Sequence, residues 1–223
     1  MLPLKDNISS QTRPIITYII LALNVVIFLY EISLGSHFGD FIMKYGAVPY
    51  YMFHPVGVSS YGTLFSSMFI HANFMHIFGN MLFLWIFADN VEDRTGHVKF
   101  IFFYLICGIA GALLHAITAP TSTVPMIGAS GAISGILGAY IILYPKARIL
   151  SLIFFGFFIR LIYLPAVLFL GIWFLYQFLF GISTLASRGG GVAYFAHIGG
   201  FIAGLLLALP FRKKKRDVEY AIF

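Results

Sequence analysis

A serine and a histidine stand far apart in this sequence, each at the head of an apolar segment that contains glycine. Ser130 lies in Gly-Ala-Ser-Gly at residues 128–131, and His197 lies in Ala-His-Ile-Gly-Gly at residues 196–200. A serine hydroxyl becomes a nucleophile when a neighbouring base takes its proton, and imidazole is the commonest such base. The two residues therefore predict acyl-transfer chemistry, with Ser130 as nucleophile and His197 as general base.

A second polar pair suits the other requirement of acyl transfer, which is a set of donors for the developing oxyanion. His76 and Asn80 are four residues apart, so on a helix they share a face. Their N–H groups, together with the backbone N–H of Ser130, would serve as such donors. The pair taken alone could equally hold two membrane helices together by hydrogen bonding. His71 is five residues before His76 and is expected to face elsewhere.

Acidic residues are missing where a catalytic triad would need one. The eight acidic residues are Asp6, Glu31, Asp40, Asp89, Glu92, Asp93, Asp217 and Glu219. None lies near the head of a segment that carries Ser130, His197 or His76. We therefore expect a Ser-His dyad, oriented by packing or neutral hydrogen bonds. The sequence has no His-Glu-x-x-His motif, and no metal or cofactor is expected.

The composition is typical of a membrane protein. Of the 223 residues, 60% are hydrophobic and 10% are charged, with 25 Phe and 13 Tyr. Apolar segments that are candidate membrane spans occur at residues 15–32, 72–88, 97–119, 130–144, 164–182 and 192–209. The predicted fold class is an all-α polytopic membrane protein with six transmembrane helices. Residues 33–70 form an irregular first loop, and residues 146–163 are expected to be an interfacial connector.

The helix expected at residues 130–144 is short. At 1.5 Å per residue it covers about 22 Å, against about 30 Å of hydrocarbon. Its head at Ser130 should lie below the membrane surface, beside protein or water. Glycines suited to close helix contact follow both motifs: Gly131, Gly135, Gly138, Gly200 and Gly204. Two such faces let helices approach closely, which would bring Ser130 within reach of His197.

The basic residues predict the orientation. With both termini cytoplasmic, six spans leave only Lys44 and Arg188 of the fourteen Lys and Arg on the outer side. The run RKKKR at residues 212–216 follows an apolar helix, which favours anionic membrane lipids, and not nucleic acid, as its partner. We expect a cytoplasmic segment at residues 1–14, without the features of a signal peptide. A membrane domain at 15–210 and a basic cytoplasmic tail at 211–223 complete the expected organisation.

These motifs resemble those of the rhomboid family of intramembrane serine proteases. The matching stretches are GASG at 128–131, HIFGN at 76–80, NVE at 90–92, and AH at 196–197 with the GxxxG at 200–204. The resemblance covers nearly the whole chain. It implies a six-transmembrane-helix rhomboid-like bundle with a membrane-dipping first outer loop. The helix at 164–182 would be the mobile gate for substrates.

The resemblance also implies a role for each matching residue. Ser130 would be the nucleophile, His197 the general base, His76 and Asn80 the oxyanion hole, and Gly128 the motif glycine. The expected activity is hydrolysis of peptide bonds in or near transmembrane segments of single-pass membrane proteins. Such substrates and membrane lipids are the expected partners, and no cofactor is implied. The expected location is the cell membrane of a prokaryote.

Two features depart from the family pattern. The first loop has no Trp-Arg pair, and Ser134 stands where some members place an aromatic residue that stacks on the base. The main alternative is a catalytically inactive rhomboid-like protein that binds membrane clients, which loss of the serine or histidine would mark. A transporter is disfavoured because the two halves show no internal repeat and the apolar helices offer few carboxylates.

Overall fold

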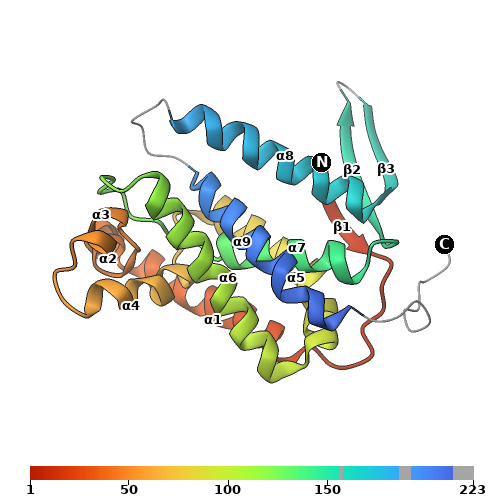
Figure 1. Cartoon of the computed structure of the whole chain (residues 1–223), viewed down its shortest axis with the longest axis horizontal. Coiled ribbons are helices and arrows are strands. Elements are labelled where there is room, and N and C mark those ends of the chain that lie inside the picture. Colours follow the sequence, from red (N-terminus) through yellow and green to blue (C-terminus); the bar gives the residue numbers. More distant parts are fainter. Residues whose placement is uncertain (156–157, 186–191, 213–223) are drawn as a thin grey trace.

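The computed structural model describes residues 1–155, 158–185 and 192–212. Its longer helices are α1 Ile15–Ser33, α5 Phe74–Thr95, α6 His97–Thr118, α7 Ser130–Leu143, α8 Ala166–Leu185 and α9 Tyr194–Ala208 (Figure 1). Within the described residues, five of them are long and apolar enough to cross a membrane, which indicates a multi-pass membrane protein. α7 has 14 residues, so the predicted short helix is confirmed. A count of six spans stays a prediction.

Two regions singled out in the sequence fall outside this description. They are Arg188, within residues 186–191, and residues 213–223, which include most of the basic run.

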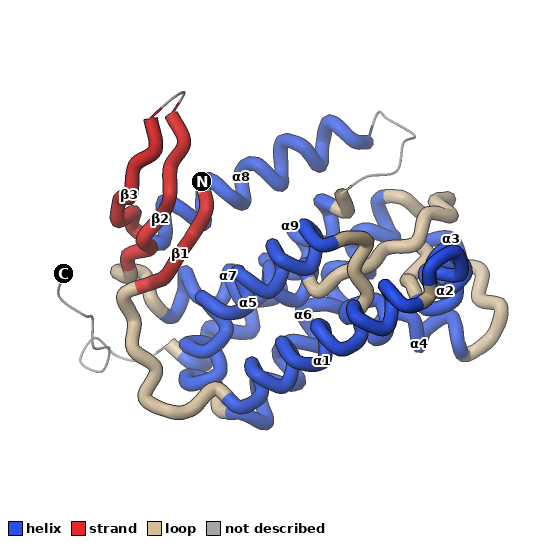
Figure 2. Tube along the Cα trace, turned by 180° about the vertical axis from the view of Figure 1, so that it is seen from behind, coloured by secondary structure: helices blue, strands red, loops and turns tan. Residues whose placement is uncertain are grey.

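α7 lies in the middle of the bundle. It packs against α5, α6 and α9 in both views (Figures 1 and 2). Every residue from 132 to 140 of α7 is buried. α1 and α8 lie at the periphery instead, where they expose apolar side chains such as Leu29 and Leu179. Such surfaces suit contact with lipid, and the buried helix at the centre is the one that carries Ser130.

α7 and α9 approach each other through glycine. A Cβ atom built on Gly200 would fall on the carbonyl oxygen of Gly131, and one on Gly204 would fall on that of Gly135. From the other side, a Cβ atom on Gly138 would overlap the carbonyl oxygen of Phe201. The predicted close contact of two glycine faces is therefore confirmed.

α5 runs further than the sequence suggested. The predicted span ends at residue 88, but residues 89–94 form the last turns of α5, which ends at Thr95 before Gly96 with its φ of +80°. The reason is that these acidic side chains bind the chain's N-terminal segment. Asp89 accepts a hydrogen bond from Ser10 at 2.6 Å, and Glu92 accepts one from the backbone N–H of Thr17 at 2.7 Å.

The loop after α1 contains short helices. They are η1 Gly35–His37, α2 Phe38–Tyr45, α3 Pro49–Phe53, α4 Ser59–Ser66 and η2 Ser67–Phe69. α2, α3 and α4 gather at one end of the molecule (Figure 1). Ala47 pairs with Met126 in a two-residue antiparallel bridge, and the N–H of Gly128 donates to the carbonyl of Ser67 at 2.8 Å. The loop therefore contacts the chain directly before α7.

A three-stranded sheet corrects the all-α prediction. Its strands are β1 Leu2–Asp6, β2 Arg148–Phe155 and β3 Phe158–Pro165, antiparallel in the order β1-β2-β3. Leu2 pairs with Leu152, and Arg148 pairs with Pro165 (Figure 2). The predicted connector at 146–163 is thus mostly a hairpin. Its β-branched and aromatic residues favour strands, and the pairing across 150 residues of sequence could not be recognised locally.

Candidate active site

Ser130 and His197 meet at the same end of the bundle. Ser130 is the first residue of α7, and His197 lies in the first turn of α9. The Oγ of Ser130 lies 2.8 Å from Nε2 of His197, which is a hydrogen-bond distance. The glycine contact between α7 and α9 places the two helix starts close enough for this bond. The structure therefore brings these two predicted residues together.

A glutamine holds the other side of the imidazole. Nδ1 of His197 lies 2.8 Å from Oε1 of Gln177, a residue of α8 that is 6% exposed. An amide oxygen can only accept, so Nδ1 carries the proton and donates it. Nε2 is then left with a lone pair that accepts the hydroxyl proton of Ser130. This tautomer is the one that a general base requires.

Gln177 was not among the predicted site residues. The prediction was only that packing or neutral hydrogen bonds would orient His197. Gln177 is the one amide side chain in α8, whose sequence is otherwise almost wholly apolar. A strongly polar group in such a helix is costly unless it has a partner, and that signal was available.

Aromatic contact with His197 comes from α8 and α9. The ring of Trp173 lies 6.1 Å from that of His197, centroid to centroid, and the ring of Tyr194 lies 6.5 Å away. Ser134 does not point at the imidazole, because its hydroxyl donates to the carbonyl of Ser130 at 2.6 Å. The aromatic contacts of the imidazole therefore come from Trp173 and Tyr194, and none comes from position 134.

His76 and Asn80 both lie beside Gly128. A Cβ atom on Gly128 would lie 2.7 Å from Nε2 of His76 and 3.6 Å from Nδ2 of Asn80. Gly128 also has φ of +115°, a conformation that strains any other residue. Only glycine leaves room for these two polar groups directly before α7, whose first N–H groups lack partners within the helix.

The protonation of these side chains makes them donors. Nδ1 of His76 accepts the backbone N–H of Ala72 at 3.3 Å, so the proton of the neutral ring is on Nε2. Nδ2 of Asn80 is buried and has no hydrogen-bond partner among the described residues. Both N–H groups face the space beside Gly128. The position suits a bound carbonyl oxygen that gains negative charge.

His71 lies differently from the prediction. α5 begins at Phe74, so His71 precedes the helix, and its ring contacts that of His76 edge-on at 5.0 Å. The prediction that His71 faces away from His76 assumed that both residues lie on one helix, and that assumption does not hold. Burial, and next the neighbouring His76, lower the pKa of His71 to about 4. His71 is consequently a neutral side chain at physiological pH.

Comparison with known proteins agrees with this arrangement. A family model described as "Rhomboid domain" matches residues 59–214. The chain is 34% identical over 155 residues to Rhomboid protein 1, mitochondrial, of Saccharomyces cerevisiae, covering 67% of this chain and 41% of that protein. It is 31% identical over 201 residues to Rhomboid protease GluP of Bacillus subtilis, covering 89% and 36%. The chain thus spans less than half the length of these two relatives. The chain belongs to the rhomboid family.

Proposed function

We propose that this chain is an intramembrane serine endopeptidase. It hydrolyses peptide bonds in or near transmembrane segments of single-pass membrane proteins by a dyad of Ser130 and His197. The observation that carries the proposal is the pair of 2.8 Å hydrogen bonds on either side of the His197 ring. They give the ring the tautomer of a base and aim it at a single hydroxyl.

The reaction follows from this tautomer. As the Ser130 Oγ attacks the substrate carbonyl carbon, its proton passes to Nε2 of His197, and the imidazolium that forms is stabilised by Oε1 of Gln177. The imidazolium then gives the proton to the leaving amine, and the C–N bond breaks to leave an acyl ester on Ser130. A water molecule, deprotonated by His197, hydrolyses that ester and restores the hydroxyl.

The oxyanion of each tetrahedral intermediate is bound by His76, Asn80 and the backbone N–H of Ser130. The distances of His76 and Asn80 from the Gly128 position support this role. Preorganised donors act strongly where water is excluded, and removal of one typically lowers kcat by about 10²–10³.

α8 is the gate in this proposal. Its apolar surface is exposed, and it carries both Gln177 and Trp173 against His197. Displacement of α8 would therefore open the site and at the same time release the base from its orienting partner. Catalysis would then require α8 to return over a bound substrate.

The proposal also includes the location, the orientation and the partners of the protein. The protein lies in the cell membrane with both termini cytoplasmic, anionic lipids bind the tail at residues 211–223, and substrates reach the membrane domain at 15–210 laterally. The lopsided distribution of Lys and Arg supports this orientation. Related proteins include mitochondrial and chloroplastic forms by name, so localisation by fractionation of the native cell is the direct test.

The first experiment is labelling with a serine-directed fluorophosphonate probe in detergent or bicelles. Wild type should be labelled, whereas Ser130→Ala and His197→Ala should not. Ser134→Ala is the matched control, because it removes a buried hydroxyl one turn away on the same helix and should leave labelling in place. A folded wild type that is neither labelled nor able to cleave a model transmembrane substrate would refute the protease proposal and favour the client-binding alternative.

A further inference from the structure

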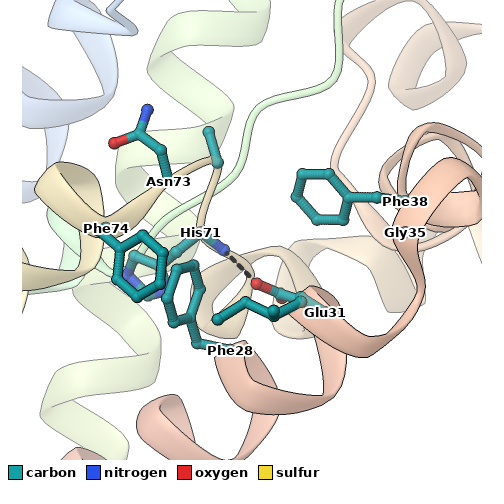
Figure 3. A pocket seen from close by; sticks show the side chains of 9 residues that line it. Phe28, Glu31, Gly35, Phe38, His71, Asn73 and Phe74 are labelled. Carbon is teal, nitrogen blue, oxygen red and sulfur yellow. Dashed lines mark hydrogen bonds between the residues drawn. The ribbon is translucent and has the colours of Figure 1, made fainter.

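A pocket lies at the same end of the bundle as the dyad, and it is lined by other residues than the dyad. Its volume is about 300 Å³. It lies between the end of α1 and the start of α5, and the loop at η1 and α2 covers it (Figure 3). Ser130, His197 and Gln177 do not line it. The residues that do are Phe28, Glu31, Ile32, Gly35, Phe38, His71, Ala72, Asn73 and Phe74.

Glu31 is the charged group of this pocket. The residue is 2% exposed, and Oε2 accepts the backbone N–H of His71 at 3.2 Å. Oε1 has no hydrogen-bond partner, and within the described part of the chain no basic side chain forms an ion pair with Glu31. A buried carboxylate is costly without a counter-charge. Oε1 of Glu31 is therefore an unsatisfied acceptor in the wall of this pocket, and a cation bound in the pocket would supply its counter-charge.

Aromatic rings form the rest of the wall. Phe28 and Phe74 pack edge to face, with centroids 5.1 Å apart, and Phe38 approaches from the other side of the pocket (Figure 3). The faces of aromatic rings attract ammonium groups. A site that combines several rings with one carboxylate binds an ammonium group more selectively than the rings or the carboxylate alone. Phenyl rings are not ligands for metal ions. The wall thus favours an organic cation over an inorganic one.

His71 forms part of the pocket wall. The residue is fully buried, and neither Nδ1 nor Nε2 has a hydrogen-bond partner among the described residues. It is the backbone N–H of His71, and not its ring, that bonds the Glu31 carboxyl.

We propose that this pocket binds an organic ammonium group, with Glu31 as its counter-ion and Phe28, Phe38 and Phe74 around it. The source favoured by the structure is the ethanolamine headgroup of a phospholipid. The mouth of the pocket is lined by Ile32 and Phe74, which are 48% and 71% exposed. α1 continues this apolar surface, so acyl chains can lie along it while the headgroup enters.

The pocket shares a wall with the proposed oxyanion hole. Asn73 lines the pocket, and its side chain accepts the backbone N–H of His76 at 2.9 Å. Ala72 also lines it and donates to Nδ1 of His76. A bound ammonium would therefore touch the segment that orients His76, which gives the binding a route to influence catalysis.

Native mass spectrometry of the full chain tests the binding. The protein is released from micelles containing equal amounts of phosphatidylethanolamine and phosphatidylglycerol with identical acyl chains. Wild type should retain the ethanolamine lipid with a preference of about tenfold, and Glu31→Gln should abolish that preference. Asp40→Asn is the matched control, because this acidic residue is exposed on the neighbouring α2 and does not line the pocket.

Competition separates the two sources of the ammonium group. Free ethanolamine at millimolar concentration should displace the lipid from wild type but not alter the residual binding of Glu31→Gln. Free ethanolamine that binds by itself, with no lipid preference, would assign the pocket to a small amine. A wild type with no preference and no response to ethanolamine, or a Glu31→Gln protein with unchanged preference, would overturn the proposal.

Two further variants keep the test interpretable. If Glu31→Gln does not fold, Phe38→Ala preserves the carboxylate and removes one ring of the pocket wall, and it should reduce the preference severalfold. Ser130→Ala should retain the full preference, because that residue lies outside the pocket. Lipid binding and proteolysis can therefore fail independently of each other.

Discussion

The amide oxygen of Gln177 lies 2.8 Å from Nδ1 of His197, so a residue of α8 orients the proposed base on α9. We predict that Gln177→Leu lowers kcat by about 10–100-fold, since a lost buried hydrogen bond costs about 1–3 kcal/mol. KM should change little. The readout is steady-state cleavage of a model transmembrane substrate. Gln11→Leu replaces an exposed glutamine and should leave the rate unchanged. Equal rates for the two variants would remove Gln177 from the mechanism.

Gly128 allows no side chain beside His76. We predict that Gly128→Ala lowers the rate of cleavage by about 100-fold or more. The reason is that φ at this position is +115° and the new Cβ would lie 2.7 Å from Nε2 of His76. The fold should persist, as checked by circular dichroism. Gly39→Ala is the control, since a Cβ there has nothing within 4 Å. A fully active Gly128→Ala protein would contradict the assignment of His76 as a donor.

The contact between α7 and α9 should tolerate no added bulk. Gly204→Val would place a side chain on the carbonyl oxygen of Gly135, and overpacking of this kind costs about 1–3 kcal/mol or more. We expect a clear fall in the midpoint of unfolding by denaturant, with loss of labelling by the fluorophosphonate probe. Gly171→Val on α8, which has open space around it, should change neither quantity. Retained stability in Gly204→Val would show that the helices can separate freely.

Asp6 should make stability depend on pH. Burial, despite a hydrogen bond from Tyr140, raises the pKa of this β1 carboxyl from 3.8 to about 7. The folded chain then binds a proton that the unfolded chain has lost over this range, so stability should rise as pH falls from about 8 to about 5. Asp6→Asn should flatten part of this dependence. Thermal unfolding at several pH values is the measurement, and an unchanged slope in the variant would contradict the assignment.

Long apolar segments and glycine spacing predicted most of the bundle. The helix predicted at residues 130–144 is α7, Ser130–Leu143, and its glycines contact α9 as their spacing indicated. The functional roles of Ser130, His197, His76, Asn80 and Gly128 stay predictions. The approach of Ser130 to His197, however, could be predicted, because the glycines that bring their two helices together are visible in the sequence.

Two features required the structure. The β1 strand pairs with residues that lie far along the sequence, and nothing local in Leu2–Asp6 announces a partner. In the sequence, Gln177 is one polar residue in an apolar helix. Its hydrogen-bond partner, His197, can be identified only when α8 is placed beside α9. Both are long-range relationships, whereas periodicity and spacing report on short-range ones.

The pairing of Leu2 with Leu152 also has a consequence for how the protein is made. During synthesis β1 is translated well before its partner strand β2, which follows α1, α5, α6 and α7 in the chain. Until then, the open edge of β1 is available to other chains or to a chaperone. The sheet therefore forms late in biogenesis. The helix that follows it in the chain, α8, is among the last to pack into its final position.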